Sequence, residues 1–116
     1  MSVSAAPRST AGAARWLVIG RADEVPLLEG RAVTVDGRRL AVFHLLDGWT
    51  AIDHACPHRG GPLSDGLVAD GCVTCPLHSQ RFSLLTGERQ DGPGPGVEVH
   101  AVRERDGLIE LRWPAP

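Results

Sequence analysis

The stretch Cys56-Pro57-His58-Arg59-Gly60-Gly61-Pro62, followed further on by Cys75-Pro76-Leu77-His78, decides how this chain is interpreted. Sixteen residues separate His58 from Cys75, so the full pattern is C-x-H-x16-C-x2-H. Each half supplies one thiol and one imidazole, and a proline directly follows each cysteine. Thiolates and imidazoles are common metal ligands in proteins. The pattern therefore predicts a single metal centre whose ligands are Cys56, His58, Cys75 and His78.

Two kinds of metal centre use two cysteines and two histidines. One is a [2Fe–2S] cluster in which two histidines replace two cysteines on one iron, and the other is a structural zinc tetrahedron. The segment Cys72-Val73-Thr74-Cys75 offers a zinc-like C-x-x-C pair. However, zinc sites usually group cysteine with cysteine and histidine with histidine, and a C-x-H pair is short for a zinc knuckle. The spacing thus favours iron and sulfur, with zinc and a chance pairing of cysteines and histidines as the alternatives.

With its two ligand loops, the sequence resembles the Rieske [2Fe–2S] family over residues 16–113. The resemblance is specific in the loops and generic in the strands. It implies one [2Fe–2S] cluster per chain, with Cys56 and Cys75 on the inner iron and His58 and His78 on the outer iron. It also implies an electron carrier, since histidine ligation raises the reduction potential of the cluster.

Respiratory members of the Rieske family carry an additional cysteine in each loop, and these two cysteines form a disulfide beside the cluster. The corresponding positions here are Gly61 and Leu77, so the disulfide is absent. Where those relatives place serine and tyrosine hydroxyls, this chain has Gln80 and Phe82. With fewer donors to the sulfurs, we predict a potential near the low end of the Rieske range, on the order of −150 mV.

The composition indicates a single β-rich domain. The chain has 116 residues and a formal charge of −2, which predicts no attraction to nucleic acid or to a membrane surface. No apolar run approaches the length of a membrane span.

Residues 1–15 lack the apolar core of a secretory signal and are expected to form a disordered tail. Three cysteines without an export signal suggest metal ligation in a reducing, cytoplasmic compartment.

Asp-Gly pairs between apolar stretches predict hairpin turns at 36–37, 47–48, 70–71 and 106–107. The strands expected around them cover residues 16–20, 31–35, 40–46, 50–54, 67–69, 72–74, 80–84, 97–105 and 108–113. No stretch shows a long helical period. The fold class is therefore all-β, and the resemblance implies a Rieske-type antiparallel sandwich or barrel. Its small cluster-binding subdomain would lie within residues 55–90, and residues 92–96 would form a stiff connector.

Other residues able to carry chemistry have simpler interpretations. Cys72 is expected to be a small buried thiol that binds no metal. Arg59, next to a predicted ligand, would be an ordinary solvated side chain or would help a partner to dock. Strand positions without ligand spacing predict packing or surface roles for the remaining histidines and the tryptophans, namely His44, His54, His100, Trp16, Trp49 and Trp113.

Within the family, the two loops look most like those of the small subunit of assimilatory NAD(P)H-dependent nitrite reductase. That resemblance implies a large partner subunit with flavin and sirohaem that reduces nitrite to ammonia. The alternative is a free Rieske ferredoxin that passes electrons from a flavoprotein reductase to an aromatic-ring dioxygenase or related oxygenase. A third possibility is a module without redox activity that holds a structural metal. In each case we expect an electron-transfer or binding component with no self-contained active site.

Overall fold

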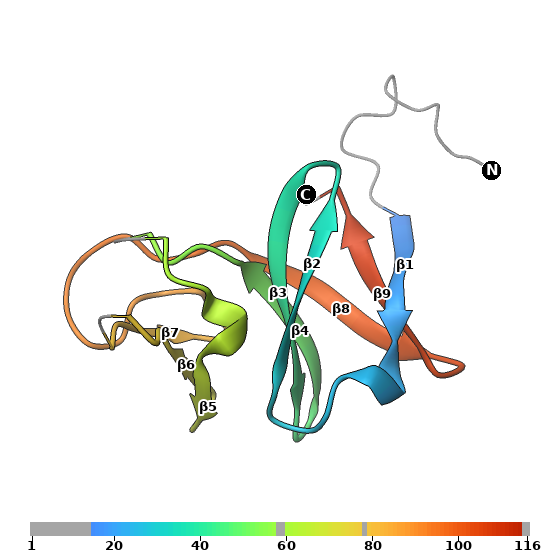
Figure 1. The fold of residues 1–116 in the computed structure, drawn as a ribbon, viewed down its shortest axis with the longest axis horizontal. Helices are drawn as coiled ribbons and strands as arrows, with labels where there is room; N and C mark the ends of the chain where they lie inside the picture. The colour runs from blue at the N-terminus through green and yellow to red at the C-terminus, as the bar shows by residue number, and fades with distance from the viewer. Residues whose placement is uncertain (1–14, 58–59, 78, 115–116) are drawn as a thin grey trace.

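The computed structural model describes residues 15–57, 60–77 and 79–114. In these residues the chain forms two antiparallel sheets (Figure 1). The larger sheet has the strand order β1-β9-β8-β4-β3-β2. Its strands are β1 (Arg15–Arg21), β2 (Gly30–Val35), β3 (Arg38–Leu45), β4 (Gly48–Asp53), β8 (Val99–Arg105) and β9 (Leu108–Trp113). The predicted all-β fold is confirmed.

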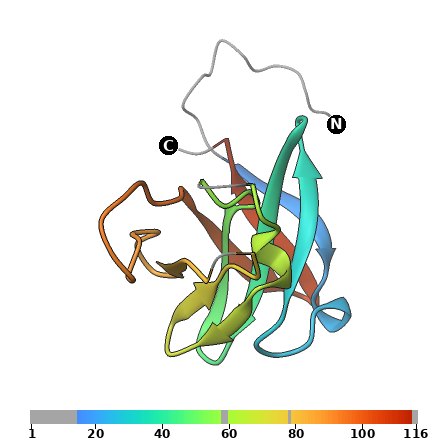
Figure 2. The same ribbon diagram turned by 60° about the vertical axis from the view of Figure 1, so that its left-hand side comes forward.

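The smaller sheet lies to one side of the larger one and is built from three short strands. These are β5 (Leu67–Ala69), β6 (Cys72–Thr74) and β7 (Arg81–Ser83), in the order β5-β6-β7. Turned by 60°, the molecule shows these strands in front of the larger sheet (Figure 2). The described helical segments are two 3-10 turns, η2 (Ala22–Glu24) and η3 (Leu63–Asp65). No helix in the described ranges is long and apolar enough to span a membrane.

Strand β3 joins two apolar cores because both of its faces are buried. Its central residues, Leu40 to Phe43, are at most 1% exposed. Leu40 and Val42 pack into the core of the larger sheet, together with Ile109 and Leu111. Ala41 and Phe43, on the opposite face, pack against the smaller sheet and the ligand loops. A strand buried on both faces has no alternation of polar and apolar residues, which explains the continuous sequence Leu-Ala-Val-Phe.

Three of the four predicted Asp-Gly turns are confirmed. At 36–37, 70–71 and 106–107 both residues have positive φ, as a two-residue hairpin turn requires. The turn predicted at 47–48 is wrong by one residue. Leu45 pairs with Gly48, so Leu46 and Asp47 form the turn and Gly48 is the first residue of β4. Leu46 is 80% exposed in this turn, although the sequence pattern had placed this apolar residue inside a strand.

The predicted connector follows β7 and returns the chain to β8. A backbone hydrogen bond fixes its C-terminal end to the turn after β7: the N–H of Val97 donates to the carbonyl of Gly87 at 2.8 Å. Gly87 has a φ of 81°, and a Cβ there would overlap the carbonyl oxygen of Val97. This close contact holds the connector against the loops of the smaller sheet.

Candidate metal centre

The first ligand loop, between β4 and η3, is a compact hairpin centred on Cys56. The N–H of Cys56 donates to the carbonyl of Gly61 at 2.9 Å, and the N–H of Gly60 donates back to the carbonyl of Cys56 at 2.7 Å. Below these bonds, Ala55 and Pro62 form an isolated antiparallel bridge. Gly60, at the fourth position after the cysteine, has a φ of 70°.

The second loop, between β6 and β7, repeats the same hydrogen-bond pattern around Cys75. The N–H of Cys75 donates to the carbonyl of Gln80 at 2.7 Å, and the N–H of Ser79 donates to the carbonyl of Cys75 at 3.0 Å. Thr74 pairs with Arg81, as Ala55 pairs with Pro62 in the first loop. Ser79, the equivalent of Gly60, has a φ of 59°. The structure thus builds one hairpin twice, each time with a cysteine at its base.

Each loop also touches the cysteine of the other. Gly61 of the first loop lies so close to the second that a Cβ on it would be 2.6 Å from Cys75 Sγ. In the other direction, Gln80 of the second loop places its Oε1 3.4 Å from Cys56 Sγ. These reciprocal contacts place the two cysteine segments side by side.

The burial and chemistry of the site fit a metal cluster better than a pair of inert thiols. Cys56 and Cys75 are 3% and 1% exposed and belong to the same core. The predicted ligands His58 and His78 lie outside the described residues, as does Arg59. The chain contains three cysteines in all, so it cannot supply four thiolates to a cluster by itself. A [2Fe–2S] centre in one chain would therefore need other ligands, and imidazole is the established substitute.

Comparison with known proteins agrees with this interpretation. Residues 15–103 match the Rieske [2Fe-2S] domain family. The chain belongs to this family. A Rieske [2Fe–2S] domain implies a [2Fe–2S] cluster, and the paired hairpins are where this chain would hold it.

Rieske proteins of two functional groups are similar to this chain. The anthranilate 1,2-dioxygenase ferredoxin subunit of Burkholderia cepacia is 35% identical over 99 residues, which cover 84% of this chain and 92% of the relative. A solved structure assigned as the small subunit of an NADH-dependent nitrite reductase from Mycobacterium tuberculosis superposes with a TM-score of 0.80. It is 29% identical and covers 89% of this chain and 98% of its own. The carbazole 1,9a-dioxygenase ferredoxin of Nocardioides aromaticivorans IC177 has a TM-score of 0.76 at 25% identity, with 83% and 95% covered.

The structure also places the positions that carry the disulfide in respiratory Rieske proteins. A Cβ on Gly61 would lie 3.1 Å from Cγ of Leu77, so the two positions face each other as the resemblance implies. Leu77 is 54% exposed at this end of the molecule. An apolar contact therefore occupies the place of the disulfide.

Gln80 has a larger role than its position in the sequence suggested. Its side chain is 6% exposed, and its amide lies against Cys56 Sγ. A thiol can donate to the amide oxygen, whereas a thiolate can only accept, from the amide N–H₂. Gln80 can therefore hydrogen-bond to Cys56 in both protonation states, through its amide oxygen to a thiol or through its amide N–H₂ to a thiolate. In this structure the Gln80 Oε1 accepts from Cys56 Sγ, and Gln80 would be a donor to a thiolate only with its amide turned over.

The tryptophans occupy the places predicted for them, whereas Cys72, expected to be buried, is partly exposed. Cys72 is half-buried in β6 and does not belong to the core that contains Cys56 and Cys75. Trp16 lies under the Arg103 guanidinium, 4.0 Å from its ring centroid. The indole N–H of Trp49 donates to Glu104, and that of Trp113 donates to Asp36. These contacts fix the tryptophans as packing residues of the larger sheet.

Of the histidines outside the loops, His44 has the packing role predicted for it, whereas His54 and His100 have buried ring nitrogens without a hydrogen-bond partner among the described residues. His44 hydrogen-bonds to the carbonyl of Val25 at 2.9 Å and stacks on Trp49. Among the described residues, the ring nitrogens of His100 and Nδ1 of His54 have no hydrogen-bond partner. Burial, followed by the charge of Arg39, lowers the pKa of His54 and so disfavours its protonated form. His100 Nε2 lies 3.6 Å from Asp53, whose carboxylate is paired with Arg38.

Proposed function

We propose that the chain is a one-electron carrier whose [2Fe–2S] cluster is bound by Cys56, His58, Cys75 and His78. When bound, the cluster supplies reversible one-electron chemistry. The paired hairpins carry the proposal, because they bury two thiolates in one core and brace each against the opposite loop. Two thiolates leave the oxidised site neutral, whereas four would leave it at −2, so an electron is easier to add. We place the chain in a reducing cytoplasm, where cysteine thiols stay available as metal ligands.

Within that role, we propose the small subunit of an assimilatory NAD(P)H-dependent nitrite reductase. The superposition at TM-score 0.80 on a protein of that assignment supports this proposal, and it extends over nearly the whole of both chains. The first-loop sequence Cys-Pro-His-Arg-Gly-Gly-Pro supports it as well. The partner would be a large subunit that contains flavin and sirohaem and supplies the nitrite site.

A free ferredoxin of an aromatic-ring dioxygenase or related oxygenase is the second candidate. The 35% identity to a dioxygenase ferredoxin over 84% of this chain favours it. In that role the chain would pass electrons from a flavoprotein reductase to a terminal oxygenase.

Purification from the native host distinguishes the two roles. The tagged chain is isolated anaerobically, and the visible spectrum of everything that accompanies it is recorded. A large partner with sirohaem and flavin bands supports the nitrite reductase subunit. A brown chain that comes alone, with only Rieske bands, contradicts that role and supports the ferredoxin. Cys56→Ser, isolated in parallel, shows whether any association depends on the cluster.

Exchanging a histidine ligand for cysteine should lower the potential. His58→Cys or His78→Cys adds a negative charge to the site, so the midpoint should move toward the value of about −400 mV typical of four-thiolate ferredoxins. Protein-film voltammetry measures the shift, and His44→Cys in β3 is the control because His44 is bound to Val25 and Trp49 instead. An unchanged potential in both loop variants would argue against imidazole ligation.

The potential should also depend on pH in the alkaline range. Reduction adds a negative charge and so raises the pKa of a coordinating imidazole. Above the imidazole pKa of the oxidised state, reduction therefore takes up a proton and the potential falls as pH rises. The slope should approach about 59 mV per pH unit for one proton and one electron. Voltammetry across the range tests this, and a potential constant up to about pH 10 is incompatible with it.

A further inference from the structure

Arg89 is a cation held in one position beside the candidate metal centre. Its Nε donates to Asp91 Oδ1 at 2.9 Å and its Nη2 donates to Asp91 Oδ2 at 3.2 Å, so the pair is bidentate. Its Nη1 donates to the carbonyl of Pro93 at 3.1 Å. Behind it, a Cβ on Gly94 would lie 2.7 Å from Nη1. With all three guanidinium nitrogens bound and 23% of its side chain exposed, Arg89 has little freedom to move.

Asp91 is also held in place by the backbone, so the Arg89–Asp91 ion pair has a fixed position. Its Oδ1 also accepts the backbone N–H of Arg81, the first residue of β7, at 3.0 Å. The bond from Arg89, followed by the bond from Arg81, holds the pKa of Asp91 well below its usual range. The pair therefore remains ionised throughout the pH range in which the protein is handled.

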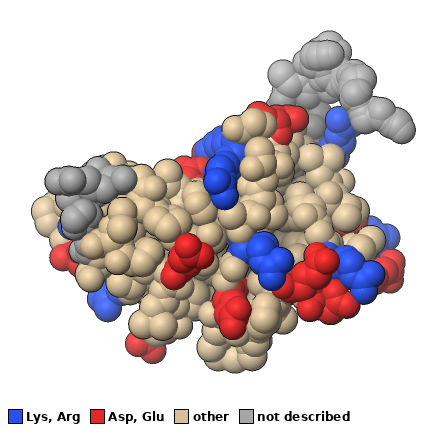
Figure 3. Space-filling view, in the orientation of Figure 1, with Lys and Arg blue, Asp and Glu red and all other residues tan. Residues whose placement is uncertain are grey.

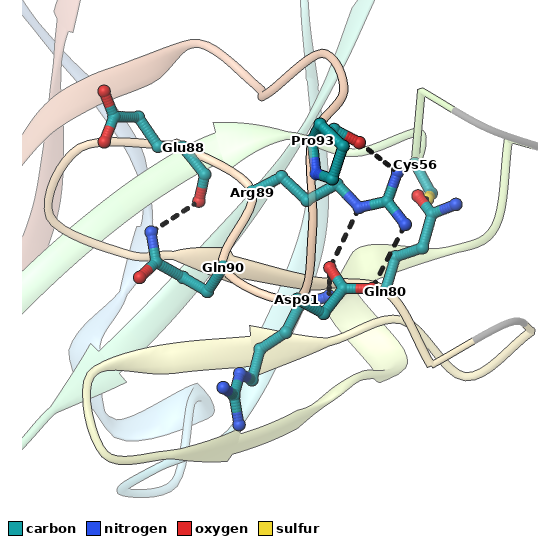
Figure 4. Close-up of polar contacts among 8 residues, drawn as sticks. Cys56, Gln80, Glu88, Arg89, Gln90, Asp91 and Pro93 are labelled. Carbon is teal, nitrogen blue, oxygen red and sulfur yellow. Dashed lines mark hydrogen bonds and ion pairs between the residues drawn. The ribbon is translucent and has the colours of Figure 1, made fainter.

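The guanidinium lies on the side of this pair that faces Cys56. Figure 4 shows it between the Asp91 carboxylate and the group formed by Cys56 and Gln80. The pKa of Arg89 is raised first by its hydrogen bond to Asp91, then by the charge of that carboxylate, and last by negative charge on Cys56. A negative charge on Cys56 would therefore face the guanidinium of Arg89 and not the carboxylate of Asp91.

We propose that Arg89 is a positioning residue for charge, whose fixed guanidinium stabilises the reduced form of the centre through Cys56 and so raises its reduction potential. The inference rests on the proposed assignment of Cys56 as a ligand. One-electron reduction adds one negative charge to the site, and part of that charge is carried by the thiolates. A nearby cation lowers the free energy of the reduced state more than that of the oxidised state. Asp91 offsets this effect only in part, because the guanidinium lies between its carboxylate and Cys56 in Figure 4.

The charge of Arg89 is tested by two variants with opposite expected effects. Arg89→Gln removes the cation and should make reduction about tenfold less favourable, which is a downward shift of about 59 mV for one electron. Asp91→Asn removes the counter-charge while Arg89 keeps its bond to Pro93, and should shift the potential upward. A purely structural role for the pair would not give shifts of opposite sign.

The pair Arg21–Asp23 provides matched controls. It has the same i, i+2 spacing and the same bidentate geometry, at 3.1 and 2.8 Å, but lies at the end of β1 in the larger sheet. Arg21→Gln and Asp23→Asn should leave the potential unchanged. The midpoint is measured by voltammetry on protein whose visible spectrum shows an intact cluster.

The outcomes separate this inference from the proposed function. A Rieske spectrum in the native chain, with Arg89→Gln no different from Arg21→Gln, overturns the role of Arg89 and leaves the electron carrier standing. If Arg89→Gln fails to assemble the cluster, Asp91→Asn decides, and an unchanged or lower potential in that variant also overturns the role. A native chain without an iron–sulfur spectrum overturns the proposed function itself.

Discussion

Replacing Cys56 or Cys75 with serine should abolish cluster binding. A serine hydroxyl is far less acidic than a thiol and is a poorer ligand for iron. In the proposed assignment each of these cysteines supplies one of the two thiolate ligands. Both side chains are at least 97% buried in one core, so no described cysteine can take the place of the lost ligand. We expect Cys56→Ser and Cys75→Ser to be colourless and to contain no stoichiometric iron, as measured by visible absorption and metal analysis.

Cys72→Ser is the matched control for these variants, since Cys72 is the third cysteine and lies outside the shared core. It should retain full iron content and an unchanged spectrum. Because metal binding contributes folding free energy, the two ligand variants should also unfold at lower denaturant concentration than Cys72→Ser. Loss of the cluster from Cys72→Ser, with retention in Cys56→Ser, would overturn the ligand assignment.

The second large effect is expected at Gly87, where the connector meets the smaller sheet. Gly87→Ala would place a Cβ against the carbonyl oxygen of Val97 and would also require alanine to adopt a φ of 81°. The nearest atom is the backbone carbonyl oxygen of Val97, a residue held by the Val97–Gly87 hydrogen bond, so it cannot move away without loss of that bond. We expect a loss of unfolding free energy on the order of 3 kcal/mol or more, measured by urea denaturation of the cluster-loaded protein.

Gly71→Ala separates the two contributions to that loss. Gly71 has a similar φ of 73°, but no atom lies within 4 Å of the position that its Cβ would take. This variant carries the backbone strain without the overlap and should cost about 1 kcal/mol. Equal losses in Gly71→Ala and Gly87→Ala would show that the connector does not pack as described.

The strands were predictable because each is either apolar or alternating and is bounded by turn residues. All nine predicted strands are present in the described residues, with boundaries shifted by up to two residues. The error at 47–48 arose because Leu46, an apolar residue, takes a turn position that the Asp-Gly pair was expected to fill. Local sequence could not show this, because the register is set by pairing along the whole of β3 and β4.

The site was predictable to the extent that its chemistry is local in sequence. Spacing predicted that Cys56 and Cys75 share one site, and the contacts of Gly61 and Gln80 place the two loops side by side. The place of Arg89 beside Cys56 could not be foreseen. It depends on how the connector folds back over β7, through bonds to Asp91 and Pro93. The only signal in the sequence was an arginine and an aspartate two residues apart, and Arg21–Asp23 shows the same spacing far from the loops.

On the face in Figure 3, acidic and basic side chains are interspersed, in keeping with the formal charge of −2. A choice between the two proposed roles therefore depends on isolating the partner, whereas the metal centre can be tested on the chain alone.

The most direct test of the central claim is pulsed electron paramagnetic resonance on the purified, reduced protein, with metal analysis of the same sample. The account predicts two irons per chain and coupling of the unpaired electron to two imidazole nitrogens, both lost in Cys56→Ser. A colourless protein that contains zinc, or an iron–sulfur signal without nitrogen coupling, would contradict it.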